Sequence, residues 1–307
     1  MEPTGSTGLK PLRLSDAPVI ETFFRNLKRP LADVNLIVVL AWRKALRLEY
    51  LIENAVLYVF GMVGRKKVLW LPPLGSRDLN LLDVFRGLQL LRDNQSVKTN
   101  GIIRNVWEEY PLFPELQRNS DFLISTEAKE YVYQTSKITH LFGGAFKAKR
   151  ADVRFFTREY RPEVFPYDVS AAQECLALLD EWLRQKRVRC DGPTFHKAVR
   201  EYEVCKAALC DGFPLEGIVC RVGSRIVAFS LGVPHVDDSF NCVFEKADLT
   251  LRGCSAFVFS SLASNLEERF ALINAGEDWG VPQLRLAKEL WRPVLTRRIY
   301  QVIDRRA

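Results

Sequence analysis

A short polar stretch between two apolar runs carries the side chains that could do chemistry. It reads FEKADLTLRGCS over 244–255, with a strand-like run before it and a helix-like run after it. Two carboxyl groups can take a proton from a nucleophile and return one to a leaving group. We therefore expect Glu245 and Asp248 to be the catalytic acid and base.

The alternation of side chains along a strand indicates which of these charges faces inward. If Val243 points into the core, Glu245 shares its face, whereas Lys246 lies on the opposite face and should point outward. The alternative is a surface ion pair with Lys246 or Arg252, which would stabilise the protein by less than roughly 1 kcal/mol. We favour Glu245 as the polar group at the reacting centre.

The start of the following helix could bind an anion. A helix N-terminus presents unpaired N–H groups and a partial positive charge, and Gly253 would let a phosphate approach the backbone. We expect Arg252, Gly253 and Lys246 to contact a phosphorylated donor; the alternative is a glycine that only relieves strain in the turn. Asn274 and Lys288 lie after the next strand-like run and could line the same cleft, although Lys288 could also belong to a solvated helix face.

The charge balance also points to an anionic partner. Lys and Arg number 44 against 37 Asp and Glu, so the net charge is +7. A nucleic acid, a phospholipid or a phosphorylated cofactor would suit this charge, and the alternative is simply a basic surface. The candidates for phosphate contact lie in the run KAKRADVR, at Lys147, Lys149, Arg150 and Arg154.

Composition excludes several other classes. Seven scattered cysteines without a CxxC pair, together with only three histidines, indicate neither a metal site nor a disulfide framework. No apolar run reaches the roughly 18 residues that would span a bilayer, and the N-terminus lacks the pattern of a signal peptide. We expect a cytoplasmic protein with no integral membrane segment.

Hydrophobic periodicity predicts the order of elements in the second half. After a short strand at 153–156, we expect helices at 170–187 and 194–210 and strands at 216–222, 225–233 and 239–247. A helix at 253–270, a strand at 270–276, a helix at 282–291 and a strand at 296–303 follow. Gly223 and Ser224 form a two-residue hairpin signal.

The first half repeats this order more loosely. Helices are expected at 17–27, 34–46, 79–94 and 107–116, and strands at 48–54, 55–63, 66–74, 99–106 and 121–133. Halves of similar length with the same order suggest an internal duplication. The prediction is an α/β (α+β) chain of two tandem domains, at 10–135 and 151–307, joined by a basic linker at 136–150. Each should hold a mixed, mainly antiparallel sheet flanked by helices.

This order of elements resembles the acetyltransferase-like fold known as GNAT, and specific motifs indicate a family. The chain resembles the C-terminal catalytic domain of phosphatidylglycerol lysyltransferases across both halves. The motifs are LWLPPLG (69–75), KAKRADVRFF (147–156), IVAFSLG (226–232), FEKAD (244–248) and INAGEDWGVPQLRLAK (273–288).

The resemblance implies an acyltransferase that moves an aminoacyl group from aminoacyl-tRNA to an amine or hydroxyl of a lipid headgroup or small molecule. The tRNA would be a co-substrate, with no permanently bound cofactor, and the basic residues of 147–154 would contact it. The family's long membrane-spanning segment is not seen, which favours a soluble acceptor or a lipid approached from the surface.

Two other functions stay open. One is an N-acyltransferase that depends on acyl-coenzyme A, and the other is a GNAT-like binding module without catalysis. Coenzyme A enzymes of this fold usually carry Arg or Gln three residues before the glycine of the turn, where this chain has Thr250. Coenzyme A is therefore the less favoured donor, and the oligomeric state is left open.

Overall fold

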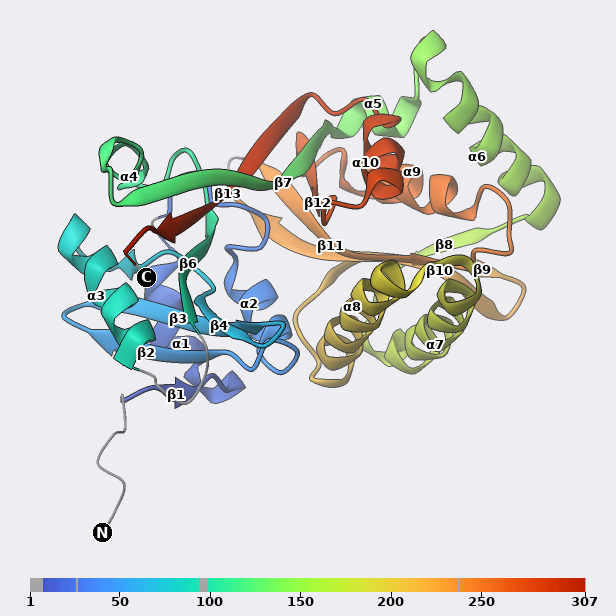
Figure 1. Ribbon diagram of the computed structural model, residues 1–307. Helices are drawn as coiled ribbons and strands as arrows, with labels where there is room; N and C mark the ends of the chain where they lie inside the picture. The colour runs from blue at the N-terminus through green and yellow to red at the C-terminus, as the bar shows by residue number, and fades with distance from the viewer. Residues whose placement is uncertain (1–7, 26, 94–98, 237, 307) are drawn as a thin grey trace. The chain divides into compact units, whose positions relative to one another are not determined.

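The computed structural model describes residues 8–25, 27–93, 99–236 and 238–306 of the chain (Figure 1). The chain divides into two compact units, Met1–Lys129 with Arg297–Ala307, and Glu130–Thr296. Each unit holds a mixed, mainly antiparallel sheet with helices beside it, which confirms the predicted fold class. Within the described ranges, no helix is both long and apolar enough to span a bilayer.

The first unit is built on antiparallel strands β2, β3 and β4, after which β6 joins β4 in parallel. Its strands are β1 (Lys10–Pro11), β2 (Glu49–Glu53), β3 (Val56–Val63), β4 (Lys66–Leu69), β5 (Leu74–Gly75), β6 (Thr99–Val106) and the first part of β7 (Phe122–Gln134). Its helices are α1 (Ala17–Ile20), α2 (Leu36–Trp42), α3 (Leu81–Asp93) and α4 (Phe113–Arg118). These elements follow the predicted order.

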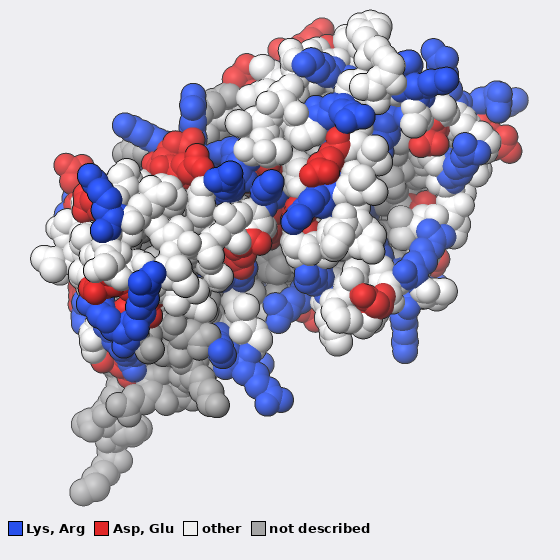
Figure 2. Space-filling model, turned by 45° about the horizontal axis from the view of Figure 1, so that its top comes forward, with Lys and Arg blue, Asp and Glu red and all other residues white. Residues whose placement is uncertain are grey.

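The second unit has the strand order β7-β12-β11-β10-β9-β8, antiparallel except between β11 and β12. Its strands are the end of β7, β8 (Glu163–Pro166), β9 (Glu216–Val222), β10 (Arg225–His235), β11 (Ser239–Ala247) and β12 (Leu272–Glu277). Its helices are α5 (Thr135–His140), α6 (Lys147–Tyr160), α7 (Ala172–Arg189), α8 (Gly192–Cys210), α9 (Cys254–Leu266) and α10 (Pro282–Glu289). Figure 2 shows basic and acidic side chains interspersed over the visible face.

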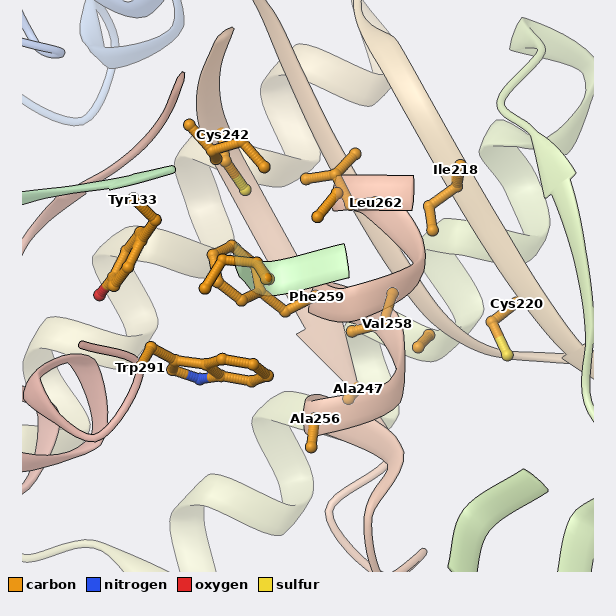
Figure 3. Close-up of a cluster of buried hydrophobic side chains, with 14 of the residues drawn as sticks. Tyr133, Ile218, Cys220, Cys242, Ala247, Ala256, Val258, Phe259, Leu262 and Trp291 are labelled. Atoms are coloured by element: carbon orange, nitrogen blue, oxygen red, sulfur yellow. The ribbon is translucent and has the colours of Figure 1, made fainter. Parts of the chain in front are cut away.

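Helix α9 is the centre of the core in the second unit. It is apolar on most sides because it packs between the sheet and helices α5 and α6. Val258, Phe259 and Leu262 are buried against strand residues that include Ile218 and Cys242, as Figure 3 shows. Helices α7 and α8 lie on the other face of this sheet, where α7 contacts β10 and β11 (Figure 1).

The predicted strand at 153–156 is wrong, because these residues lie inside helix α6. Phe156 is fully buried, and Val153 and Tyr160 pack against the same core. Their spacing of three and four residues is that of one helix face, which the local run of apolar residues concealed. The first strand of this region is β8 instead.

Residues 136–150, expected to form a linker, fold as part of the second unit. They contain most of α5, the short 3-10 turn Gly144–Phe146 and the start of α6, and Ile138 and Phe146 are buried in the core. The division between the units falls instead between Lys129 and Glu130.

The last strand of the chain belongs largely to the first unit. Strand β13 (Leu295–Asp304) pairs with β6, as in Tyr300 with Val106 and Val302 with Ile103. The end of β7 pairs instead with β12 of the second unit, as in Tyr133 with Ile273. The end of β7, from the first half of the sequence, therefore pairs within the second unit, and most of β13, from the second half, pairs within the first unit.

Candidate functional site

A bulge in β11 sets the direction of the side chains at the candidate site. Leu231 pairs with Phe244 and the next residue, Gly232, pairs with Cys242, so Val243 is one extra residue on β11. A bulge bends its strand and turns the neighbouring side chains. A Cβ on Gly232 would meet the carbonyl oxygen of Asn241 at 1.9 Å, so the opposing strand has room only for glycine. Glu245 follows this bulge directly.

The parallel strands β11 and β12 are paired only at their beginnings. The pairs are Ser239 with Leu272, Phe240 with Ile273 and Asn241 with Asn274. No pair is recorded beyond Asn274 in these two strands, both of which lie in the part of the chain that the structure describes. Glu245 is thus carried by the part of β11 that has left its parallel neighbour.

Glu245 is a partly buried carboxyl group on β11. Its Oε2 accepts a hydrogen bond of 3.4 Å from the Oγ of Ser230, which also lies 3.3 Å from the Sγ of Cys242. Burial raises the pKa of Glu245 to about 7, against the opposing effect of Lys288, Lys246 and Lys149. A carboxyl group with this pKa can both accept and release a proton near neutral pH.

Two partly buried lysines come close enough to act on Glu245. The Nζ of Lys288, on α10, donates hydrogen bonds to the carbonyl oxygens of Ala275 and Gly276 at the end of β12, the second at 3.3 Å. The Nζ of Lys149, on α6, lies 4.5 Å from the ring centroid of Trp291. Burial lowers the pKa of both lysines. Lysines on two helices therefore act to lower the pKa of Glu245.

An aromatic cluster supports this arrangement. The ring of Phe259 meets Tyr133 and Trp291 edge-on, at centroid distances of 5.4 and 4.9 Å (Figure 3). The hydroxyl of Tyr133 donates a hydrogen bond of 2.9 Å to the carbonyl oxygen of Lys288, which fixes α10 beside the strands. Burial raises the pKa of the Tyr133 phenol above its ordinary value, so the phenol stays neutral and its hydroxyl remains a hydrogen-bond donor.

Lys246 does not point outward, so that prediction is wrong. It lies on the face of β11 opposite to Glu245, as the alternation predicted, but helices α7 and α8 cover that face. Its Nζ is 2.6 Å from the Oε1 of Glu201 on α8 and 4.8 Å from the ring centroid of Trp182 on α7. An ammonium enclosed in this way is not available to a donor molecule.

Asp248 holds the turn after β11. Its Oδ1 accepts hydrogen bonds from the side chain of Gln185 and the backbone of Thr250, and its Oδ2 accepts one from Arg225. Burial alone would raise the pKa of Asp248, but the hydrogen bonds from Thr250, Arg225 and Gln185 lower it. The structure therefore gives this carboxylate an anchoring position, and its hydrogen bonds go to partners other than Glu245.

Gly253 lies against helix α6. Its φ is +83°, and a Cβ there would meet the carbonyl oxygen of Asp152 at 2.4 Å and the Cβ of Phe156 at 3.1 Å. The missing side chain lets two helices approach, which is a structural use of the glycine like the alternative left open above. Arg252 beside it is exposed, and its guanidinium lies 4.6 Å from the ring centroid of Phe155.

The other expected site residues have varied surroundings. Lys147 and Arg154 are exposed on α6. Arg150 donates hydrogen bonds to the carbonyl oxygens of Leu141 and Gly143, and so ties the preceding loop to α6. Asn274 is buried, and its Oδ1 accepts a hydrogen bond of 2.9 Å from the backbone of Gly276.

Sequence reasoning missed the residues that complete the surroundings of Glu245, namely Ser230, Tyr133 and Trp291. The one available signal was Ser230, a hydroxyl inside the apolar strand run IVAFSLG. Over the residues that the structure describes, no group of three or more His, Cys, Asp or Glu could hold a metal ion. All seven cysteines are free.

Comparison with solved structures agrees with the fold. A conserved protein of unknown function from Bacteroides thetaiotaomicron is 25% identical, with a TM-score of 0.79 over 96% of this chain and 99% of that one. L-PGS from Bacillus licheniformis is 15% identical, with a TM-score of 0.66 over 94% and 92% of the two chains. A tandem GNAT protein from the clavulanic acid biosynthesis pathway is 8% identical, with a TM-score of 0.52 over 97% and 98%.

Sequence comparison identifies the family. A search of curated proteins gives no match. The family model described as "Phosphatidylglycerol lysyltransferase, C-terminal" matches residues 33–303, which covers both units. The chain therefore belongs to the phosphatidylglycerol lysyltransferase C-terminal family, an acyltransferase family with the tandem GNAT fold.

Proposed function

We propose that this protein transfers an aminoacyl group from aminoacyl-tRNA to an amine or hydroxyl of a small molecule or lipid headgroup. The observation that carries the proposal is Glu245, a partly accessible carboxyl group with its pKa raised to about 7 and lysines on two helices near it. Strongly shifted proton affinities of this kind are concentrated at catalytic sites.

The reaction requires one proton to move and one negative charge to be stabilised. Glu245 as carboxylate takes the proton from the acceptor's amine or hydroxyl as it attacks the ester carbonyl carbon. The tetrahedral oxyanion that forms is stabilised by the ammonium of Lys288 or Lys149. The bond from the carbonyl carbon to the ribose oxygen then breaks, and the proton held by Glu245 passes to that oxygen.

Three exposed cations favour tRNA as the donor. Lys147 and Arg154 are exposed on α6, and Arg252 stacks on Phe155 of the same helix. Phosphate contacts of this kind give nucleic acids a salt-dependent affinity. Coenzyme A is the less favoured donor because Thr250 stands where enzymes of this fold that use coenzyme A usually carry Arg or Gln.

Glu245→Gln should leave folding and tRNA binding intact while lowering aminoacyl transfer by about 100-fold or more, because the amide cannot take a proton. Transfer of a labelled amino acid from charged tRNA to extracted lipids or small amines measures the effect. The control is Glu163→Gln, a change at an exposed site on β8. Equal turnover in Glu245→Gln and the unaltered protein would remove Glu245 from the mechanism.

Lys147→Ala and Arg154→Ala should each weaken charged-tRNA binding and reduce the slope of log K against log salt by about 0.7–0.9. Filter binding at several salt concentrations measures this, with calorimetry of acetyl-coenzyme A as the competing case. Tight binding of coenzyme A without salt-sensitive binding of tRNA would contradict the aminoacyl-tRNA proposal and favour the N-acyltransferase.

A further inference from the structure

Lys246 is a charged side chain enclosed on the face of β11 that lies opposite to Glu245. Its side chain is 0% exposed, and its Nζ donates hydrogen bonds to the Oε1 of Glu201 at 2.6 Å and the carbonyl oxygen of Glu245 at 3.0 Å. Only the ammonium of this pair is enclosed, because the side chain of Glu201 is 37% exposed. Apolar residues often replace an enclosed charge and its partner without loss of stability. The presence of this pair directly behind the proton-exchanging residue therefore suggests a role beyond packing.

We propose that Lys246 is a positioning residue for Glu245: it holds the main chain of Glu245 from behind the strand and places a fixed positive charge near its carboxyl group. This inference rests on the proposed function, in which Glu245 moves the proton. The hydrogen bond to the carbonyl oxygen of Glu245 carries the first part. The same hydrogen bond places the ammonium beside Glu245, and the ion pair with Glu201 keeps that ammonium charged in its enclosed position.

The other groups that act on Glu245 differ from Lys246 in one respect. Lys288 on α10 and Lys149 on α6 have a lowered pKa and are only partly buried, and the phenol of Tyr133 and the thiol of Cys242 are neutral. Burial would lower the pKa of Lys246, but Glu201 on α8, together with the neighbouring thiol of Cys205, raises it. Lys288 and Lys149 can therefore respond to a bound substrate, whereas the charge of Lys246 is constant throughout the range in which Glu245 titrates.

Titration of Glu245 by carbon-13 NMR tests the inference in a protein labelled at glutamate carboxyl carbons. The signal of Glu245 is identified by its loss in Glu245→Gln. In Lys246→Met, and in the double variant Lys246→Met with Glu201→Met, the midpoint should rise from about 7 by about one pH unit or more, because a nearby opposite charge has been removed. Lys246→Arg keeps the charge and should stay near the original midpoint.

Lys206→Met is the matched control, since Lys206 is an exposed lysine on α8, the helix that carries Glu201. It should leave the midpoint unchanged. The double variant leaves no unpaired buried charge, so it keeps the test valid if Lys246→Met alone fails to fold.

An unchanged midpoint in the double variant, or an equal rise in Lys206→Met, would overturn the inference. Failure of the double variant to fold would overturn it too, because the pair would then belong to the stability of the unit. The titration needs no substrate. A negative transfer assay would therefore count against the proposed function and leave this result standing.

Discussion

Two opposing effects set the proton affinity of Glu245. Burial raises its pKa, while three lysines, at positions 288, 246 and 149, act to lower it. The bulge at Val243 and the room left by Gly232 place the carboxyl group where both effects act. A carboxyl group whose pKa is about 7 in the folded chain and 4.5 ordinarily links proton binding to folding.

The free energy of unfolding should record this link. Between pH 4.5 and 7 the folded chain holds a proton on Glu245 that the unfolded chain has lost, so stability falls as the pH rises through this window. Glu245→Gln removes this slope. The difference in free energy of unfolding, variant minus unaltered protein, should therefore be greater at pH 8 than at pH 5 by on the order of 1–3 kcal/mol. Urea unfolding at both pH values measures the difference. An equal difference at both pH values would show that Glu245 titrates at its ordinary pKa.

At the scale of elements, the sequence predicted most helices and strands because their periods of 3.6 and two residues are clear. It failed at α6, where four adjacent apolar or basic residues resembled a strand although the helical spacing of Val153 and Phe156 decides the structure. The prediction for the face of Glu245 assumed regular alternation from Val243, which the bulge at Val243 interrupts. The sequence could not predict that α7 and α8 enclose Lys246, because that depends on contacts between residues far apart in the chain.

The contact between α6 and α9 gives a prediction at this scale. Gly253→Ala should destabilise the protein by about 2 kcal/mol or more. The new Cβ would clash with a backbone carbonyl oxygen, and alanine is unfavourable at the positive φ of this position. Gly212→Ala is the control: its φ is +63° and nothing lies within 4 Å of the added Cβ, so it should cost only about 1 kcal/mol. Urea unfolding of both variants compares them. An equal loss of unfolding free energy in both variants would mean that α6 moves aside to make room for the new Cβ.

At the scale of the whole molecule, the end of each half's final strand belongs to the unit formed mainly by the other half. The duplication could be predicted from the order of elements, but the partners of β7 and β13 could not, because a period of two marks a strand without naming its neighbour. Val302 is fully buried in the first unit although it lies five residues before the end of the sequence. A strand therefore need not belong to the same unit as the elements that lie next to it in the sequence.

Deletion of residues 297–307 should damage the first unit more than the second. Strand β6 would lose its antiparallel partner, so its amides should exchange hydrogen faster, whereas β9 and β10 of the second unit should keep their protection. Hydrogen exchange followed by mass spectrometry measures both sets, and deletion of residues 305–307 alone is the control. Unchanged exchange in β6 would contradict the assignment of β13 to the first unit.

The position of β13 also has a consequence for synthesis on the ribosome. Domains usually fold in order as the chain emerges, N-terminal domain first. Here the sheet of the first unit lacks β13 until residues 297–304 have been translated, after the whole of the second unit. The end of β7 that pairs with β12 is, in contrast, the first part of the second unit to be made. The half that is translated first can therefore be completed only after the other half has been made.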